Sequence, residues 1–291
     1  MWIVLALTSA FCLGIYDVMK KLSVRGNNVP LVLMLTTAFS LLLMLPFIIA
    51  GALSYDFGFG NRISAHLLVL IKAVIVLGSW IMGYFAIKHL PLTVQGPINA
   101  SRPVMVLVGA MIIFGERLNV LQWTGLLLGF ASLFLISRIG TKENSGSAGK
   151  WIWLSIGAAA MGAVSALYDK FLLRRYTPLD VQSWFAFYQC LLMIVIVLVL
   201  KKKSPRETTG FKWRWTIPLI SIFLTGADAL YFYVLSHEEA LVSVVSMLRR
   251  GSVIVPFFYG MLVLSERNIG AKVLDLLLLM ISLTLLVAGS T

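Results

Sequence analysis

LLMIVIVLVL, from Leu191 to Leu200, is an unbroken apolar run, and LDLLLLMISLTLLVA, from Leu274 to Ala288, is nearly so. Neither run alternates polar and apolar residues, as the strands of a membrane β-barrel do. Backbone amides and carbonyls inside hydrocarbon must hydrogen-bond within their own segment, and a helix of about 20 residues achieves this across a bilayer core. Both runs therefore predict membrane-spanning α-helices.

The composition extends this prediction to the whole chain. Of the 291 residues, 59% are hydrophobic and 12% are charged, whereas soluble domains carry about 25% charged residues. We expect an all-α polytopic membrane protein with ten transmembrane helices. The predicted spans are residues 2–19, 30–52, 67–87, 91–114, 119–137, 151–173, 179–200, 214–236, 240–264 and 269–289.

The positive charge is unevenly distributed between the loops. The net charge is +12, but Lys and Arg lie mostly in the short odd-numbered loops, which argues against a nucleic-acid partner. Basic residues accumulate on the cytoplasmic side of membrane proteins. We therefore expect an integral protein of the bacterial inner membrane with both termini on the outer side. Lys72 and Lys170 are assigned here to the flanks of even-numbered loops.

Sequence landmarks of the first half recur in the same order in the second. A polar, glycine-rich connector, residues 140–150, separates the halves. Because each half has five spans, the two halves must enter the membrane in opposite directions. We expect two inverted five-helix repeats, residues 1–139 and 151–291. The matching landmarks are Tyr16-Asp17 with Tyr168-Asp169, Tyr84-Phe85 with Tyr231-Phe232, and Glu116-Arg117 with Glu266-Arg267.

Two motifs connect this pattern to a known family. FGERLN (114–119) stands at the end of the fourth span, within the proline-bearing stretch PLTVQGPINASRPVMVLVGAMIIFGERL (91–118) and one residue beyond it. LSERNI (264–269) stands at the end of the ninth. Over its whole length the chain resembles the EamA type of the drug/metabolite transporter superfamily. The resemblance implies a secondary carrier that works by alternating access, with substrates from amino acids to sugar phosphates and nucleotide sugars. The ninth span departs from the pattern in MLRRGSVIVP (247–256), where the proline comes three residues late.

Polar stripes on two spans predict a binding site. An arginine at a helix centre costs about 2.5 to 3.5 kcal/mol in a bilayer, so it should face a cavity or a partner. Stripes on the counterpart fourth and ninth spans should therefore converge on one aqueous site. They comprise Gln95, Asn99 and Arg102 on the fourth span, and Ser243, Ser246 and Arg250 on the ninth.

The arginines indicate the chemistry of the substrate. Guanidinium groups bind carboxylate or phosphate in a bidentate geometry. Arg102, Arg250 and Arg249 predict a small anionic or zwitterionic metabolite, such as an amino acid, a carboxylate or a sugar phosphate. The alternative is a structural role, paired with Asp228 or with helix carbonyls. Asp228 could neutralise an empty arginine, bind a substrate amine or take up a coupling proton, and we favour an ion pair that opens when substrate arrives.

Other side chains complete the candidate site. Aromatic rings can stack on a ligand, with core packing as the alternative. Asp17 and Asp169 are candidates for gating or coupling, with a solvated helix end as the alternative. The paired Glu-Arg motifs are expected to cap helices and fix the next turn. The aromatic candidates are Trp80 and Tyr84 on the third span, Trp184 and Tyr188 on the seventh, and Tyr231 on the eighth.

Other classes of function fit the sequence less well. Its three histidines lie near span ends and no catalytic, metal or nucleotide-binding motif is present, which predicts no enzyme, no metal site and no cofactor. A scaffold subunit would not need buried arginines, whereas a flippase for a lipid-linked sugar or phosphate remains an alternative. The expected partners are then a small metabolite, the lipid bilayer and a coupling ion such as a proton. The driving force is the gradient of the substrate or of that ion. A monomer fits these requirements, although the residues do not specify the oligomeric state.

Overall fold

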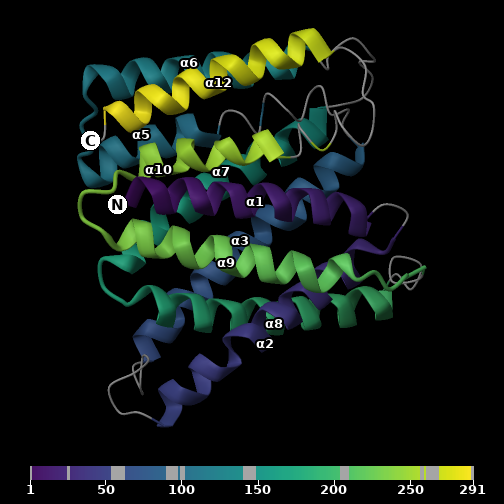
Figure 1. Cartoon of the computed structure of the whole chain (residues 1–291). Helices are drawn as coiled ribbons and strands as arrows, with labels where there is room; N and C mark the ends of the chain where they lie inside the picture. Colours follow the sequence, from purple (N-terminus) through teal and green to yellow (C-terminus); the bar gives the residue numbers. More distant parts are fainter. Residues whose placement is uncertain are drawn as a thin grey trace.

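The computed structural model of the chain is a bundle of helices (Figure 1). It describes residues 2–24, 27–53, 63–89, 98, 102–139, 149–203, 210–255, 259 and 269–289. Within these ranges the chain forms ten α-helices and one 3-10 helix, and no strand. The elements are α1(Trp2–Val24), α2(Val29–Leu53), α3(Ile63–His89), α5(Arg102–Phe114), α6(Val120–Ile139), α7(Gly149–Leu173), α8(Pro178–Lys203), α9(Thr216–Ser236), α10(Val242–Leu248), η2(Arg249–Val253) and α12(Ile269–Ala288).

Each predicted span corresponds to one α-helix, and six of these helices are long and apolar enough to cross a membrane. The fourth and ninth spans differ from the continuous helices that were expected. α5 begins at Arg102, so Gln95 and Asn99 lie outside the described residues. α10 ends at Leu248, and η2 continues the chain in the tighter 3-10 geometry. The expected α-helical stripe on the ninth span is therefore interrupted where its two arginines begin.

The main packing contacts join the two halves of the chain. α1 packs against α9, α2 against α8, α3 against α7, and α6 against α12. Each pair takes one helix from residues 2–139 and one from residues 149–289. The halves therefore share one interior, and the beginning of α1 and the end of α12 lie at the same end of the bundle (Figure 1).

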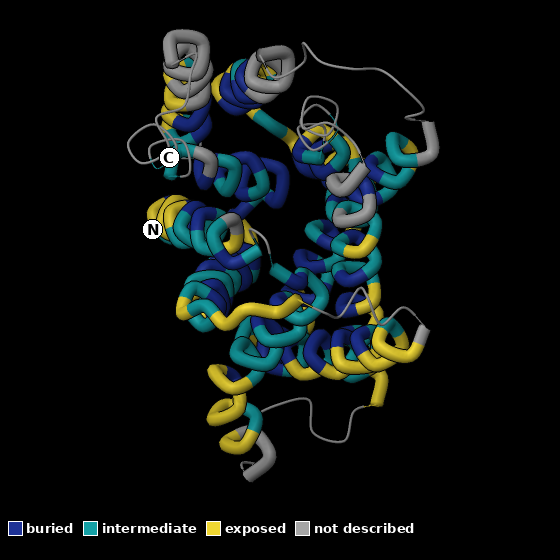
Figure 2. The backbone as a smooth tube through the Cα atoms, turned by 90° about the vertical axis from the view of Figure 1, so that its right-hand side faces the viewer, coloured by how far each residue is buried: buried dark blue, intermediate teal, exposed yellow. Residues whose placement is uncertain are grey.

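The outer faces of the bundle are apolar. Buried residues line the inner sides of the helices and exposed residues the outer sides (Figure 2). Val4, Ile112, Trp153 and Leu198 are all more than half exposed. Such a surface suits lipid, where apolar side chains need no cover from water.

The FGERLN motif forms a turn and caps the start of α10. Gly115 has φ +65° directly after α5, a conformation that glycine adopts without strain. Glu116, which follows, accepts hydrogen bonds from the backbone N–H groups of Val242 (2.6 Å) and Ser243 (3.3 Å) and from the Ser243 hydroxyl. A carboxylate at a helix N-terminus satisfies free donors and opposes the helix dipole. The predicted capping role is thus confirmed for Glu116, whose carboxylate caps the first residues of α10. Glu266 lies outside the described residues.

A buried lysine holds the other side of the same turn. Lys170 of α7 donates three hydrogen bonds from its ammonium group, to the carbonyl oxygens of Leu235 (2.9 Å), His237 (2.7 Å) and Ala240 (2.9 Å). A cation suits the carbonyl-rich end of α9. Lys170 lies in the last turn of α7, on the expected loop flank, but its side chain is 2% exposed and bonded to the chain. Lys170 and Glu116 together fix the α9–α10 turn and so place the arginines of η2.

We expect Lys170→Met to lower the free energy of unfolding by about 3 kcal/mol, because three carbonyls lose a charged donor at once. Detergent-solubilised protein unfolded by SDS titration and followed by circular dichroism measures this loss. Lys202→Met, at the exposed end of α8, is the control and should change stability by less than about 0.5 kcal/mol. Equal stability of the two variants would contradict the role of Lys170.

Candidate functional site

A cavity of about 610 Å³ lies between the two halves of the chain. Its lining comes from α1, α2, α3, α5, α7, α8, α9, α10 and η2, so every described helix except α6 and α12 contributes. A volume of this size accommodates a small organic molecule. Nine of the predicted site residues line it: Asp17, Trp80, Arg102, Asp169, Asp228, Tyr231, Ser246, Arg249 and Arg250.

Other predicted site residues lie elsewhere. Trp184 and Tyr188 are described and are not part of the cavity lining. Trp184 packs edge-on against His66 with ring centroids 4.3 Å apart, and the Tyr188 hydroxyl lies 3.1 Å from His66 Nδ1. Tyr84 lies in α3, but its side chain is not among the described ones. Ser243, which the expected stripe included, instead binds Glu116 at the start of α10.

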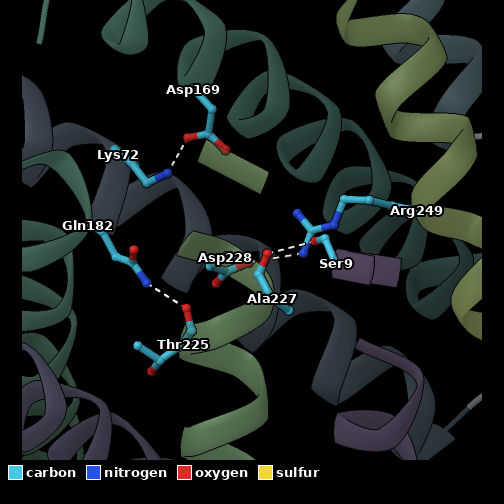
Figure 3. Close-up of polar contacts among 8 residues, drawn as sticks. All are labelled: Ser9, Lys72, Asp169, Gln182, Thr225, Ala227, Asp228 and Arg249. Carbon is cyan, nitrogen blue, oxygen red and sulfur yellow. Dashed lines mark hydrogen bonds and ion pairs between the residues drawn. The ribbon is translucent and has the colours of Figure 1, made fainter. Parts of the chain in front are cut away.

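Arg249 is paired with Asp228 at the edge of the cavity (Figure 3). Its Nη2 donates to Asp228 Oδ1 at 3.0 Å, and its guanidinium carbon lies 4.0 Å from the centre of the Tyr231 ring. Asp228 and Tyr231 are one turn apart on α9. The hydroxyl of Ser9 donates to the carbonyl of Ala227 at 2.6 Å, which fastens this part of α9 to α1. Arg249 thus has an acidic partner and an aromatic platform, as the structural alternative anticipated.

A second ion pair, between Lys72 of α3 and Asp169 of α7, lies deeper (Figure 3). Lys72 is 2% exposed and Asp169 is 5% exposed. The ammonium nitrogen also lies 4.7 Å from the Phe185 ring centre and 4.1 Å from that of Phe232. The expectations of a loop-flank position for Lys72 and a solvated helix end for Asp169 were therefore wrong. The two side chains neutralise each other inside the bundle, because neither could be buried alone at acceptable cost.

Arg102 and Arg250 carry charge that the described acids do not neutralise by direct pairing. The Arg102 guanidinium lies directly on Gly162 of α7, where an added Cβ would come within 2.6 Å of Nε. Arg102 Nε is buried without a hydrogen-bond partner. Arg250 experiences the like charges of Arg102 and Arg249, opposed by Asp17. Across the described residues, neither Arg102 nor Arg250 forms an ion pair with a carboxylate.

Several lining residues were not predicted. Lys20 of α1 and Lys72 of α3 are two of them. The position of Lys72 inside the apolar run LLVLIKAVIVL (67–77) could have indicated a buried cation. Gln182 and Gln189 lie two turns apart on one face of α8 and both reach the cavity. The Gln182 amide donates to the carbonyl of Thr225 at 2.7 Å (Figure 3).

The described residues offer no cluster of three or more His, Cys, Asp or Glu side chains that could hold a metal ion. The described lining of the cavity supplies ion pairs, guanidinium groups, amides, hydroxyls and aromatic rings.

Comparison with known proteins agrees with this architecture. A crystal structure titled only "Crystal structure of protein" aligns with a TM-score of 0.68 and 16% sequence identity, covering 99% of this chain and 94% of the other. At that identity the alignment shows a shared fold. No curated protein sequence matches the chain significantly.

Residues 1–138 match the EamA-like transporter family. That range contains the FGERLN motif, α1 to α5 and most of α6. The resemblance to the EamA type of the drug/metabolite transporter superfamily is thus confirmed by a family match over residues 1–138, which are just under half of the chain.

Proposed function

We propose that the protein is a secondary transporter that carries a small organic anion or zwitterion across the membrane. The observation that carries this proposal is the charge of the cavity lining. Among the described residues, five basic side chains and three acidic ones line the cavity. The basic residues are Lys20, Lys72, Arg102, Arg249 and Arg250, and the acidic residues are Asp17, Asp169 and Asp228.

The parts of the fourth and ninth spans that lie outside the described residues add no negative charge that would compensate this excess. Residues 90–101 contain no acidic or basic side chain, and neither do residues 256–265. The positive excess is therefore a property of the spans themselves. A bound anion would relieve the repulsion among the three arginines, and bidentate guanidinium contacts would orient it.

The packing of the helices supports the proposed inverted repeats, residues 1–139 and 151–291. If the first to fifth spans correspond to the sixth to tenth, the α1–α9 pair exchanges with the α7–α3 pair. The α2–α8 and α6–α12 pairs each map onto themselves. This is the pattern of a twofold axis between the halves. Repeats of this kind allow alternating access around a fixed site at their interface.

Arg102→Ala should abolish the stabilisation of the purified protein by its substrate while leaving the protein folded, because a ligand that binds only the folded state raises the melting temperature. The measurement is a thermal-shift screen against carboxylates, amino acids, sugar phosphates and nucleotide sugars. Arg174→Ala, an exposed arginine at the end of α7, is the matched control. A stabilising ligand that Arg102→Ala still binds as wild type does would make Arg102 structural. If no ligand stabilises the wild type, flippase assays in liposomes follow.

Asp228→Asn tests whether the Arg249–Asp228 pair opens for the substrate. The substitution removes the charge that competes for Arg249, so anion affinity should rise by about tenfold, equivalent to about 1.4 kcal/mol. Binding titrations of the ligand found above give the affinity. Asp180→Asn, at the start of α8 and not part of the lining, should leave it unchanged. A loss of affinity in Asp228→Asn would instead indicate that Asp228 binds the substrate or a coupling ion.

The proposed orientation, with both termini outside, predicts which surface positions a membrane-impermeant maleimide can reach. With Cys12 and Cys190 replaced by Ala, Arg174→Cys in the sixth loop should be labelled in intact cells. Lys202→Cys, beside the seventh loop, should be labelled only after the membrane is opened. The reverse pattern would invert the topology. Lys72 lies well inside α3 and not on its flank, which removes one cation from the even-numbered side and so strengthens the charge bias.

A further inference from the structure

Among the described residues of the cavity lining, two neutral side chains on α2 and α8 have buried polar atoms without hydrogen-bond partners. Gln189 of α8 is 3% exposed, and neither its Nε2 nor its Oε1 has a hydrogen-bond partner in the described part of the chain. The same is true of the Ser40 hydroxyl on α2. Both residues line the cavity. A buried polar atom without a partner costs about 1 to 3 kcal/mol, so these atoms call for a specific explanation.

Neighbouring polar residues of the same lining are satisfied by the protein. Thr36 and Thr37 donate to the carbonyls of Val32 and Met34, each at 2.8 Å, along their own helix. Ser79 donates to the carbonyl of Ala158 at 2.8 Å. The unpartnered state of Ser40 and Gln189 is therefore not a general feature of polar residues at this cavity.

The placement of these groups relative to the arginines is also informative. α2 and α8 pack against each other, and in Figure 1 they lie on the opposite side of α1 and α9 from α5 and α10. A molecule that fills the cavity can thus meet guanidinium groups at one side and neutral hydrogen-bonding groups at the other. A ligand hydroxyl both donates and accepts, so it can satisfy Oε1 and Nε2 of Gln189 in a way that a methylene group cannot.

We infer that Gln189 and Ser40 form a neutral subsite that binds a hydroxyl or amide group of the transported anion. This inference rests on the proposed function and narrows the substrate to an organic anion or zwitterion with a second polar group. A site built to hydrogen-bond such a group rejects an analogue that lacks it, because its own buried groups then remain unpaired.

Matched pairs of ligands test the subsite on the purified full-length protein. The pairs are glycerol 3-phosphate with propyl phosphate, malate with succinate, and serine with alanine, which differ within each pair by hydroxyl groups. In at least one pair the hydroxylated member should bind about tenfold more tightly or better. Gln189→Leu and Ser40→Ala should bring that ratio close to one and leave the affinity of the other member unchanged. Arg102→Ala should weaken both members.

A second measurement separates binding from packing. Gln189→Leu removes unpaired polar atoms, so the ligand-free protein should be as stable as wild type or more so. Gln182→Leu, two turns away on α8 and 4% exposed, breaks the bond to Thr225 and should lower the melting temperature. Destabilisation of Gln189→Leu equal to that of Gln182→Leu would place Gln189 in the packing and overturn the subsite.

The binding results distinguish this inference from the proposed function. Equal affinity for both members of every pair, or a hydroxyl preference that survives Gln189→Leu, would overturn the subsite while anion binding stood. If no anion or zwitterion bound to the wild type, the proposed function and the subsite would fall together.

Discussion

A charge placed in hydrocarbon without a partner costs several kcal/mol, and the arrangement of this protein follows from how it meets that constraint. Lys72 and Asp169 neutralise each other, as do Arg249 and Asp228. Lys170 spreads its charge over three carbonyls at the end of α9. Arg102, by contrast, has no direct acidic partner among the described residues and faces the cavity. Most of the buried charge is thus neutralised within the protein, and the charge that is not lies at the cavity.

The rigid and the available charges are mechanically connected. Lys170 and Glu116 hold opposite ends of the α9–α10 turn, one from α7 and the other from the turn after α5. α10 and η2 follow directly, so the positions of Arg249 and Arg250 depend on contacts from both halves of the chain. Helix pairs across the halves enclose the same cavity. A displacement of one half relative to the other would therefore change the arginine cluster itself.

The sequence was sufficient for the helices but only partly for the cavity. Apolar run lengths predicted all ten spans, because backbone hydrogen bonding in lipid leaves few alternatives. Arg102 and Arg250 stood out because charge is rare in such runs. Lys72 was misassigned because a span placed a few residues late makes a buried lysine look like a flank. Gln182 and Gln189 could not be distinguished from sequence, since only the fold shows that one amide donates to Thr225 and the other has no hydrogen-bond partner among the described residues. The 3-10 geometry of η2 was equally hidden, as local sequence does not separate it from an α-helix.

The contact between Arg102 and Gly162 has a consequence for the evolution of this protein. A side chain at position 162 would occupy part of the space of the guanidinium, so the arginine would have to shift its flexible end or be replaced. A relative that keeps this placement of the arginine should keep glycine at the matching point of its sixth span. A relative with a larger residue there must have moved or lost that arginine. This pair of positions, 60 residues apart in the chain, can therefore serve to sort family members by whether they retain this cavity-facing charge.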